Sequence, residues 1–478
     1  MDTFFTACMA LLLTTCSCES PSRITTSASG HWVNYEGRTL MLTGDSGTQC
    51  VLQNANLDYH AWIDDCAERG IPMVHVWSFV APRQKEDGSE IEERWGYVYP
   101  GLTPWQREDG GPSARDQRPR WNLQAFDEGP EGATDHYWPR ARDLCAYAKS
   151  KNMLVGYTVF TGWIKGNANA WPYHPFNKAN GGHLDRNLPD GVTIATAGVE
   201  IWQKSWDDQW SDAEKTQWIW ESFALKAIEE LNPFGNVFFV FLDEHSYTDG
   251  NMGDHFLHFF KKRGVCWMDW SARRQEVDFV INDTSDRVNK NSLALEGFFA
   301  EPARPYFLLE GGPYRGEEAR TSMWTFAMGG GHFSYHGDTE QETPQTGIMG
   351  YDPLVPGGDK GMERRDWLGH LSRLFNEELS HLDKMVPHNE LASDGMLCLA
   401  APPLEYVVYA GRNSSRSFSL KLPEEKGEAE AVFYNPRTGQ RSAPFHITSR
   451  GTTILMKPDD ADWVIHIRYP APQNQSMR

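Results

Sequence analysis

The feature that most constrains how this chain can fold is a series of continuous apolar runs that alternate with helical segments over residues 38–380. Runs such as "IPMVHVWSF", "MLVGYTVF" and "NVFFVFL" lack the alternation of a half-buried strand, so they indicate parallel strands covered by helices on both faces. About eight such units predict a (β/α)8 barrel. A doubly wound sheet is the alternative, but the long insertions all follow strands, which favours the barrel.

Counting along the chain makes "NVFFVFL" the fourth strand and "RPYFLLE" the seventh. The first strand is expected over residues 39–43, and "SLALEGF" is counted among the repeating units. Glu244 and Glu310 are 66 residues apart in sequence (310 − 244 = 66), whereas three units need roughly 90 residues. The helix between strands six and seven is therefore expected to be nearly absent.

Residues 385–478 have a different pattern. Short alternating runs such as "LEYVVYAG", "SFSLKLP" and "DWVIHIRYP" recur at intervals of about ten residues, which predicts an all-β sandwich. No cluster of acids or histidines converges in these runs. We therefore expect a catalytic barrel over residues 24–384, followed by an accessory sandwich domain without catalytic residues.

The N-terminal segment, residues 1–23, reads as an export signal. Residues 4–13 form an apolar stretch that is too short to span a bilayer, and "LTTCSC" resembles a bacterial lipobox with Cys16 or Cys18 as the lipidated residue. The expected location is the periplasm, the cell surface or the exterior of a bacterium. No later run predicts a transmembrane helix, so the expected membrane contact is a lipid anchor.

The net charge of −20 argues against nucleic acid as a partner, because binding to nucleic acid requires a basic surface. The 19 tryptophans suit either stacking on sugar rings or a large aromatic core. Five cysteines follow the leader without a CxxC pair, and there is no P-loop, GxGxxG or HExxH motif. We therefore expect no cofactor and no metal.

Two of the apolar runs end in acidic residues. "FVFLDEHSY" passes from strand directly into Asp243, Glu244 and His245, and "PYFLLEGGPYRG" ends its strand at Glu310. Because the carboxyl ends of barrel strands meet at one face, which carries the chemistry, Glu244 and Glu310 are expected to face each other across the mouth. The alternative is that each is an ordinary strand-end acid that caps a helix.

A facing pair of carboxyl groups suits glycoside hydrolysis. One acid protonates the leaving sugar oxygen, while the other attacks or stabilises the anomeric carbon. The negative charge of Asp243 is expected to raise the pKa of Glu244, which suits the acid, and Arg315 is expected to keep Glu310 ionised, which suits the nucleophile. This assignment predicts a retaining enzyme, with the two carboxyl groups about 5–5.5 Å apart.

Four segments together, "RTLMLTGDSGTQ", "VFFVFLDEHS", "PYFLLEGGPYRG" and "RTSMWTFAMGGGHFSYHG", resemble the apiosidase-like glycoside hydrolases. The resemblance covers most of residues 30–465. It implies a (β/α)8 barrel like that of the clan A glycosidases, followed by a C-terminal domain named for collagen binding. "VFYNPRTGQ" resembles the tryptophan-aspartate-proline segment of that domain, with Phe433-Tyr434-Asn435 in place of its core.

Carried over position by position, the resemblance implies that Glu244 is the acid/base and Glu310 the nucleophile. Members of the family often have Gly-Gly-Asp at the first position. This chain has Leu242-Asp243-Glu244 there, which is nearer to the Asn-Glu of clan A in general.

Further residues are expected to bind substrate at the same rim. Asp45 ends the first strand, and His174 and Asn177 lie in "WPYHPFNKANGGH", whose aromatic residues suit a sugar subsite. The alternative for that loop is that it packs on itself, and for His75 that it is a hydrogen-bonded core residue. The remaining expected substrate-binding residues are His75, Trp77, Asp243, His245, Tyr314, Arg315, Tyr335 and His336. "ERR", residues 363–365, is interpreted as a solvated helix face.

These features together predict an exported glycosidase that cleaves plant or algal polysaccharides or oligosaccharides. The alternative from another class is a non-catalytic carbohydrate-binding protein on a degenerate barrel. In both cases the expected partner is a carbohydrate.

Overall fold

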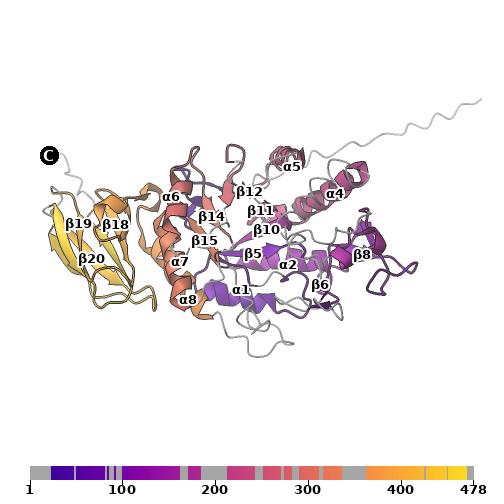
Figure 1. Ribbon diagram of the computed structural model, residues 1–478, viewed down its shortest axis with the longest axis horizontal. Coiled ribbons are helices and arrows are strands. Elements are labelled where there is room, and N and C mark those ends of the chain that lie inside the picture. The colour runs from indigo at the N-terminus through magenta and orange to yellow at the C-terminus, as the bar shows by residue number, and fades with distance from the viewer. Residues whose placement is uncertain are drawn as a thin grey trace, which may run out of the picture.

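The computed structural model describes most of the barrel and the C-terminal domain. The described residues are 23–47, 50–80, 83–84, 91–92, 99–161, 171–184, 213–242, 251–270, 274–281, 290–309, 311, 316–335, 362–424, 427–448 and 451–470. Figure 1 shows the barrel with its surrounding helices, and the C-terminal domain at one end of the molecule beside α7. None of the described helices is long and apolar enough to cross a membrane.

Eight parallel strands close into a barrel, which confirms the predicted fold and excludes the doubly wound sheet. Each strand pairs with its neighbour in the chain, and the last pairs with the first through Phe333–Thr43 and Tyr335–Asp45. In chain order the strands are β4 (Thr43–Asp45), β5 (Met73–Trp77), β10 (Leu154–Phe160), β11 (Val237–Leu242), β12 (Trp267–Trp270), β13 (Phe279–Ile281), β14 (Tyr306–Leu308) and β15 (His332–Tyr335).

Helices follow seven of these strands among the described residues. They are α1 (Tyr59–Glu68), α2 (Tyr137–Ser150), α4 (Ala213–Leu231), α5 (Asn251–Lys262), α6 (Asn291–Phe299), α7 (Gly316–Met328) and α8 (Met362–Arg373). The short connection lies between β12 and β13, strands five and six, where residues 274–278 contain no helix. The expectation of a missing helix between strands six and seven is therefore wrong, because α6, which contains "SLALEGF", occupies that connection.

Side chains on each barrel strand alternate between the lumen and the helix layer. On β11, Phe238 and Val240 belong to the core of the lumen, whereas Phe239 and Phe241 pack against the helices. Gly156 faces the lumen on β10, where a Cβ atom would lie 2.8 Å from the Phe238 ring. Large aromatic side chains therefore fill the barrel, and the absence of a side chain at Gly156 makes room for one of them.

A small antiparallel sheet closes the amino end of the barrel. Its strands are β1 (Ile24–Thr26), β2 (Val33–Tyr35) and β3 (Arg38–Leu40), and Ile24, Val33, Tyr35 and Leu40 pack on the lumen core. Glu36 and Gly37 join β2 to β3 with φ of 49° and 76°, as a two-residue type I′ turn requires. The strand expected over residues 39–43 is thus two strands, because the chain passes from β3 into β4 at Met41 and Leu42.

A long insertion follows β5. It contains two hairpins, β6 (Arg83–Gln84) with β7 (Ile91–Glu92) and β8 (Trp105–Arg107) with β9 (Trp121–Phe126). Trp105 of β8 packs on Phe79 and on Phe223 of α4, with ring centroids 5.9 and 5.1 Å apart. The second hairpin is therefore fixed to the rim near β5 and β10.

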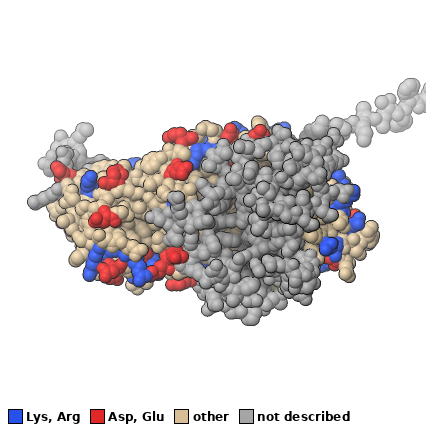
Figure 2. All heavy atoms as spheres, viewed as in Figure 1, with Lys and Arg blue, Asp and Glu red and all other residues tan. Residues whose placement is uncertain are grey.

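The C-terminal region is a β-sandwich, as predicted. One sheet has the order β16-β17-β18-β23-β20-β21, and the second contains β19 and β22. The strands are β16 (Val386–Pro387), β17 (Leu397–Ala401), β18 (Glu405–Ala410), β19 (Ser417–Lys421), β20 (Glu428–Tyr434), β21 (Phe445–Thr448), β22 (Thr452–Met456) and β23 (Trp463–Arg468). Figure 2 shows acidic and basic side chains interspersed over the described part of the visible face.

Candidate active site

The carboxyl ends of two strands lead into the predicted acids. β11 ends at Leu242, immediately before Asp243 and Glu244, and Leu309 follows β14 immediately before Glu310. Seven predicted site residues lie outside the described residues: Asp243, Glu244, His245, Glu310, Tyr314, Arg315 and His336. The structure therefore defines the strands that carry the acids, and the acids' own positions stay predictions.

The order of strands around the barrel places these two strands. β11 is the fourth and β14 the seventh, and β12 and β13 lie between them. The sequence assigned the same numbers, so the strand count is confirmed. One error was compensated by another, because β13 was not recognised and "SLALEGF", which is helical, was counted in its place.

In the ladder between β14 and β15, the β14 side has one more residue than the β15 side near the rim. Phe307 pairs with His332 and Leu308 with Phe333, a constant offset of 25 residues (332 − 307 and 333 − 308). The amide of Gly311 then donates to the Ser334 carbonyl at 2.8 Å. In other barrel ladders the amides of Phe239, Val280 and Phe333 each donate to the residue before their partner, and by the same rule Gly311 is paired with Tyr335 at an offset of 24. One residue between Leu308 and Gly311 is therefore extra, as in a β-bulge.

His75 and Trp77 lie on the lumen face of β5. His75 is fully buried, and its Nε2 is 2.8 Å from the Thr158 Oγ1 of β10. Trp77 lies two residues further along β5, nearer the mouth of the barrel, and its ring centroid is 4.4 Å from that of His75. Sequence reasoning did not identify Thr158, although its position two residues after Gly156 places it on the same lumen face.

Asp45 ends β4, but its carboxylate faces the helix layer. Oδ1 accepts hydrogen bonds from Trp62 Nε1 on α1 at 2.9 Å and from the Gly47 amide at 2.8 Å. Oδ2 lies 3.9 Å from Nη1 of Arg365 on α8, and Asp45 is fully buried. This geometry ties the end of the first strand to α1 and α8 and turns the carboxylate away from the lumen.

The interpretation of residues 363–365 as a solvated helix face is wrong for the two arginines. Arg364 and Arg365 are 6% and 1% exposed. Arg365 Nε donates to Asp65 Oδ2 at 2.8 Å, and the Arg364 guanidinium lies 5.2 Å from the centre of the Tyr335 ring. Tyr335, the predicted substrate residue at the end of β15, is 1% exposed and packs in the core between strand and helix.

The loop of residues 171–184 is packed on itself. His174 is 1% exposed, and its Nδ1 accepts a hydrogen bond from the Phe176 amide at 3.0 Å. Burial, with the charge of His183 adding to it, lowers the pKa of His174 to about 3. Asn177 donates to the Trp171 carbonyl and accepts from the Ala179 amide. His174 and Asn177 therefore use these polar atoms within the loop, which matches the alternative for this segment.

No group of three or more histidine, cysteine, aspartate or glutamate side chains in the described part of the chain is arranged to hold a metal ion. The five described cysteines, 50, 66, 145, 266 and 398, are buried and unbridged.

Comparison with known proteins shows similarity of fold. No protein-family model matches the chain, and no curated protein matches it in sequence. A solved structure described as a glycoside hydrolase superposes with a TM-score of 0.60 at 11% identity, over 95% of this chain and 98% of the other. A glycoside hydrolase family 5 protein from Bacteroides vulgatus ATCC 8482 superposes with a TM-score of 0.61 at 12% identity, over 94% of this chain and 93% of the other. The shared fold thus includes both barrel and sandwich.

Proposed function

We propose that this protein is a retaining glycoside hydrolase in which Glu244 is the acid/base and Glu310 the nucleophile. The observation that carries the proposal is the strand order. The two strands that are followed, after one intervening residue, by a glutamate are the fourth and the seventh of a closed eight-stranded barrel. Their carboxyl ends open on the face where barrel enzymes perform their chemistry.

The alternation on β11 supports Glu244, rather than Asp243, as the acid at the mouth. Phe238 and Val240 face the lumen, and the same period of two, extended beyond the strand, brings residue 244 to that side. Leu242 itself packs in the cluster that contains Phe239 and Phe241. We therefore expect Glu244 on the lumen side and Asp243 toward the helix layer. From there the Asp243 charge would still disfavour ionisation of Glu244, as a general acid requires.

The extra residue at the end of β14 supports Glu310. Phe307 and Leu309 belong to the lumen core, so a regular strand would turn residue 310 toward the helices. A bulge changes this alternation, and bulges commonly direct a side chain into an active site. We therefore expect Glu310 to reach the mouth because the ladder is irregular between Leu308 and Gly311.

The proposed reaction has two steps. Glu310 attacks the anomeric carbon while Glu244 donates its proton to the leaving glycosidic oxygen, which forms a glycosyl-enzyme ester. Glu244, now a carboxylate, then removes a proton from water, and the water oxygen attacks the same carbon and releases Glu310. The names of the structurally similar glycoside hydrolases support this class of reaction and a carbohydrate substrate.

Within this class we propose an apiosidase-like enzyme that acts on plant or algal glycans outside the cytoplasm. The motif resemblance supports the first part, and the leader of residues 1–23 supports the second. Radiolabelled palmitate should be incorporated into the full-length protein if Cys16 or Cys18 is lipidated. Substitution of both cysteines by alanine should remove the label, and a wild-type protein without label contradicts lipidation.

The assignment of roles can be tested with aryl glycosides and azide. Glu310→Ala should abolish turnover of every substrate, because no other group forms the glycosyl ester. Glu244→Ala should retain turnover of substrates with activated phenolate leaving groups, since these depart without a proton. Glu244→Gln and Glu310→Gln serve as matched controls for size.

Added azide distinguishes the two residues by stereochemistry. In Glu244→Ala it should give a glycosyl azide of retained configuration, because azide replaces the base-activated water of the second step. In Glu310→Gly it should give inverted configuration, because azide attacks from the vacated face. The opposite pair of products reverses the roles, and wild-type rates in both variants refute the proposed site.

A further inference from the structure

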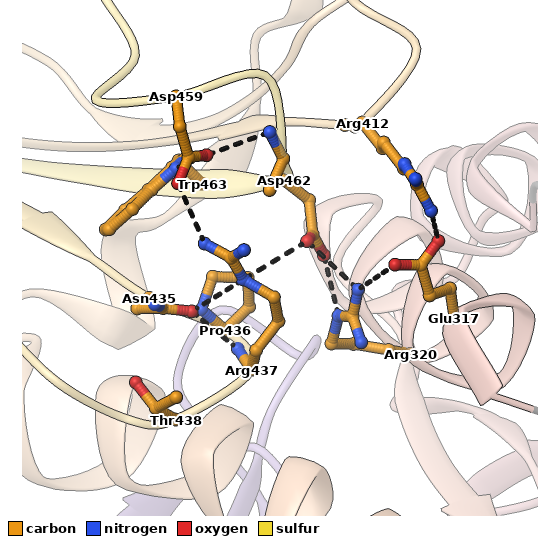
Figure 3. Close-up of polar contacts among 12 residues, drawn as sticks. Glu317, Arg320, Arg412, Asn435, Pro436, Arg437, Thr438, Asp459, Asp462 and Trp463 are labelled. Carbon is orange, nitrogen blue, oxygen red and sulfur yellow. Dashed lines mark hydrogen bonds and ion pairs between the residues drawn. The ribbon is translucent and has the colours of Figure 1, made fainter.

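The sandwich is joined to the barrel by a buried ion pair between residues 142 positions apart in sequence (462 − 320 = 142). Arg320 of α7 donates from Nε to Asp462 Oδ2 at 2.7 Å and from Nη2 to Asp462 Oδ1 at 3.0 Å. The two side chains are 4% and 2% exposed. Figure 3 shows Asp462 between Arg320 and Arg437, whose Nε lies 3.8 Å from Asp462 Oδ1. The pair is thus a two-point contact shielded from water.

Aromatic packing surrounds this ion pair. The Arg320 guanidinium lies 4.9 Å from the centre of the Trp367 ring of α8. Trp324, one turn further along α7, stacks on Tyr409 of β18 with ring centroids 5.8 Å apart and planes 10° apart. Tyr434 of β20 donates to the His370 carbonyl of α8 at 2.7 Å. The sandwich therefore contacts both helices that follow strands seven and eight.

The ion pair has a different physical effect from the aromatic contacts. Replacing a buried ion pair by apolar side chains of similar volume is often neutral or stabilising, so stability does not explain its presence. Stacked rings tolerate sliding, whereas a bidentate guanidinium–carboxylate pair fixes both the distance and the orientation of its partners. The pair therefore determines where α7 lies along its own axis relative to the sandwich.

The position of α7 affects the rim of the barrel through aromatic side chains packed between this helix and the last two strands. Gly311 is held at the rim by the Ser334 carbonyl, and α7 begins at Gly316. Phe326 of α7 packs on Tyr306 of β14 and on Phe333 of β15, with ring centroids 6.1 and 6.4 Å apart. The Phe333 ring in turn lies where a Cβ atom of Gly311 would be. A displacement of α7 therefore shifts rings that are close-packed against the end of β14.

We propose that Arg320 and Asp462 are positioning residues for the catalytic centre: the sandwich holds α7 in the register that the end of β14 requires. The proposal rests on the function proposed above, because it assumes that Glu310 at that strand end is the nucleophile. It assigns the sandwich a role in turnover although it contributes no group to the reaction.

The test is the double variant Arg320→Met/Asp462→Leu in the full chain. It keeps the branched shape at position 462 and leaves no unpaired buried charge, while the Tyr409 hydroxyl loses its 3.4 Å contact with Asp462 Oδ2. We therefore expect near-UV circular dichroism and melting temperature close to those of the wild type. Loss of the fixed register should lower kcat at least tenfold and leave KM within about twofold. The single variant Asp462→Asn, which leaves Arg320 charged, should lose stability as well.

A matched control lies on the same helix. Glu317 of α7 pairs with Arg412 of the sandwich, and both side chains are more than half exposed, at 52% and 63%. Glu317 also lies 3.8 Å from Arg320 Nη2, so the substitution is made at its partner on the sandwich. Arg412→Gln should leave kcat, KM and melting temperature unchanged, since exposed pairs contribute little. A stable double variant with wild-type kcat overturns the proposal.

Amide hydrogen exchange separates failure of this proposal from failure of the proposed function. In the double variant, the Gly311 amide should exchange at least tenfold faster than in the wild type, because its bond to Ser334 is no longer held in register. This measurement needs no substrate. A wild type without glycosidase activity refutes the function alone, and unchanged exchange in the double variant refutes the positioning role.

Discussion

We expect that the barrel does not fold without the sandwich, and a chain ending at residue 384 tests this. The apolar core next to α7 and α8 is continuous with the sandwich: Trp324 of α7, Tyr409 of β18 and Tyr434 of β20 are buried in the same cluster. Trp324 is fully buried, and both tyrosine rings pack against it. Truncation therefore exposes a face of α7 that is apolar and aromatic.

The cost of truncation can be worked out from these three rings. Each buried Trp or Tyr removes about 150–250 Å² from water, so together they bury roughly 600 Å². If about half of this area is covered by the other domain, its exposure costs ~7 kcal/mol at ~25 cal/mol per Å². This is comparable with the total stability of a typical domain, about 5–15 kcal/mol. The loss of the Tyr434–His370 hydrogen bond adds to it.

The assay compares residues 24–384 with residues 24–478 by size-exclusion chromatography, near-UV circular dichroism and thermal unfolding. We expect the shorter chain to aggregate or to lack a cooperative transition. Adding residues 385–478 as a separate chain should restore solubility and the near-UV signal. A monomeric truncated barrel that unfolds near the wild-type temperature, and that loses only polymer binding, refutes the reasoning.

Three further predictions concern buried polar side chains. Burial alone would raise the pKa of Glu405, but the hydrogen bond and charge of His466 outweigh burial and lower this pKa. The ionised Glu405 therefore adds to the free energy of unfolding above the ordinary carboxyl pKa range, and this contribution is lost as pH falls through the lowered pKa. Glu405→Gln should therefore be less stable at pH 7 and show a flatter stability profile below pH 5; an unchanged profile contradicts this. Because the pKa of His174 is about 3, the NMR resonances of its ring should not titrate between pH 5 and 8. The unfolded chain binds a proton at this residue below about pH 6.5, so the free energy of unfolding should fall as pH drops below that value. A titration midpoint near 6 would show that the ring is not buried as described. Asp45→Asn should lower the free energy of unfolding by about 2 kcal/mol, because it weakens charge-assisted hydrogen bonds beside Arg365, and it should leave KM unchanged. A raised KM at wild-type stability would show that Asp45 binds substrate.

The parts of the barrel that sequence predicted are those with long apolar runs. β11 has six consecutive buried residues, so its position and its acidic ending were evident. β13 has three residues between polar segments and was missed. α6 was counted as a further unit because "SLALEGF" is rich in apolar residues. In the structure it is a helix with one buried face, where Gly297 packs against Tyr306, and an exposed face that includes Phe299.

The candidate site was predictable in its strands and less so in its side chains. Strand ends identify which residues reach the rim, but a side chain's direction depends on the alternation and on irregularities such as the extra residue before Gly311. Met41 packs with the helices and Leu42 with the lumen, so the alternation along the strand turns Asp45 toward the helices. The sequence around Asp45 does not indicate this direction. Arg365 is buried through its contact with Asp65, 300 positions away in sequence, and Arg364 through packing on Tyr335 of the preceding strand, so charge alone was misleading.

The pairing of the last barrel strand with the first has a consequence for biosynthesis. Phe333 pairs with Thr43 across 290 residues (333 − 43 = 290), and at about 5–20 residues per second a ribosome needs roughly 15–60 s to make that length. During this time β4 lacks one of its two neighbours, and α7, which is made near the end of the interval, still lacks the sandwich that covers it. The growing chain would stay without a closed barrel for most of its synthesis, which is the condition that an export route for unfolded chains requires.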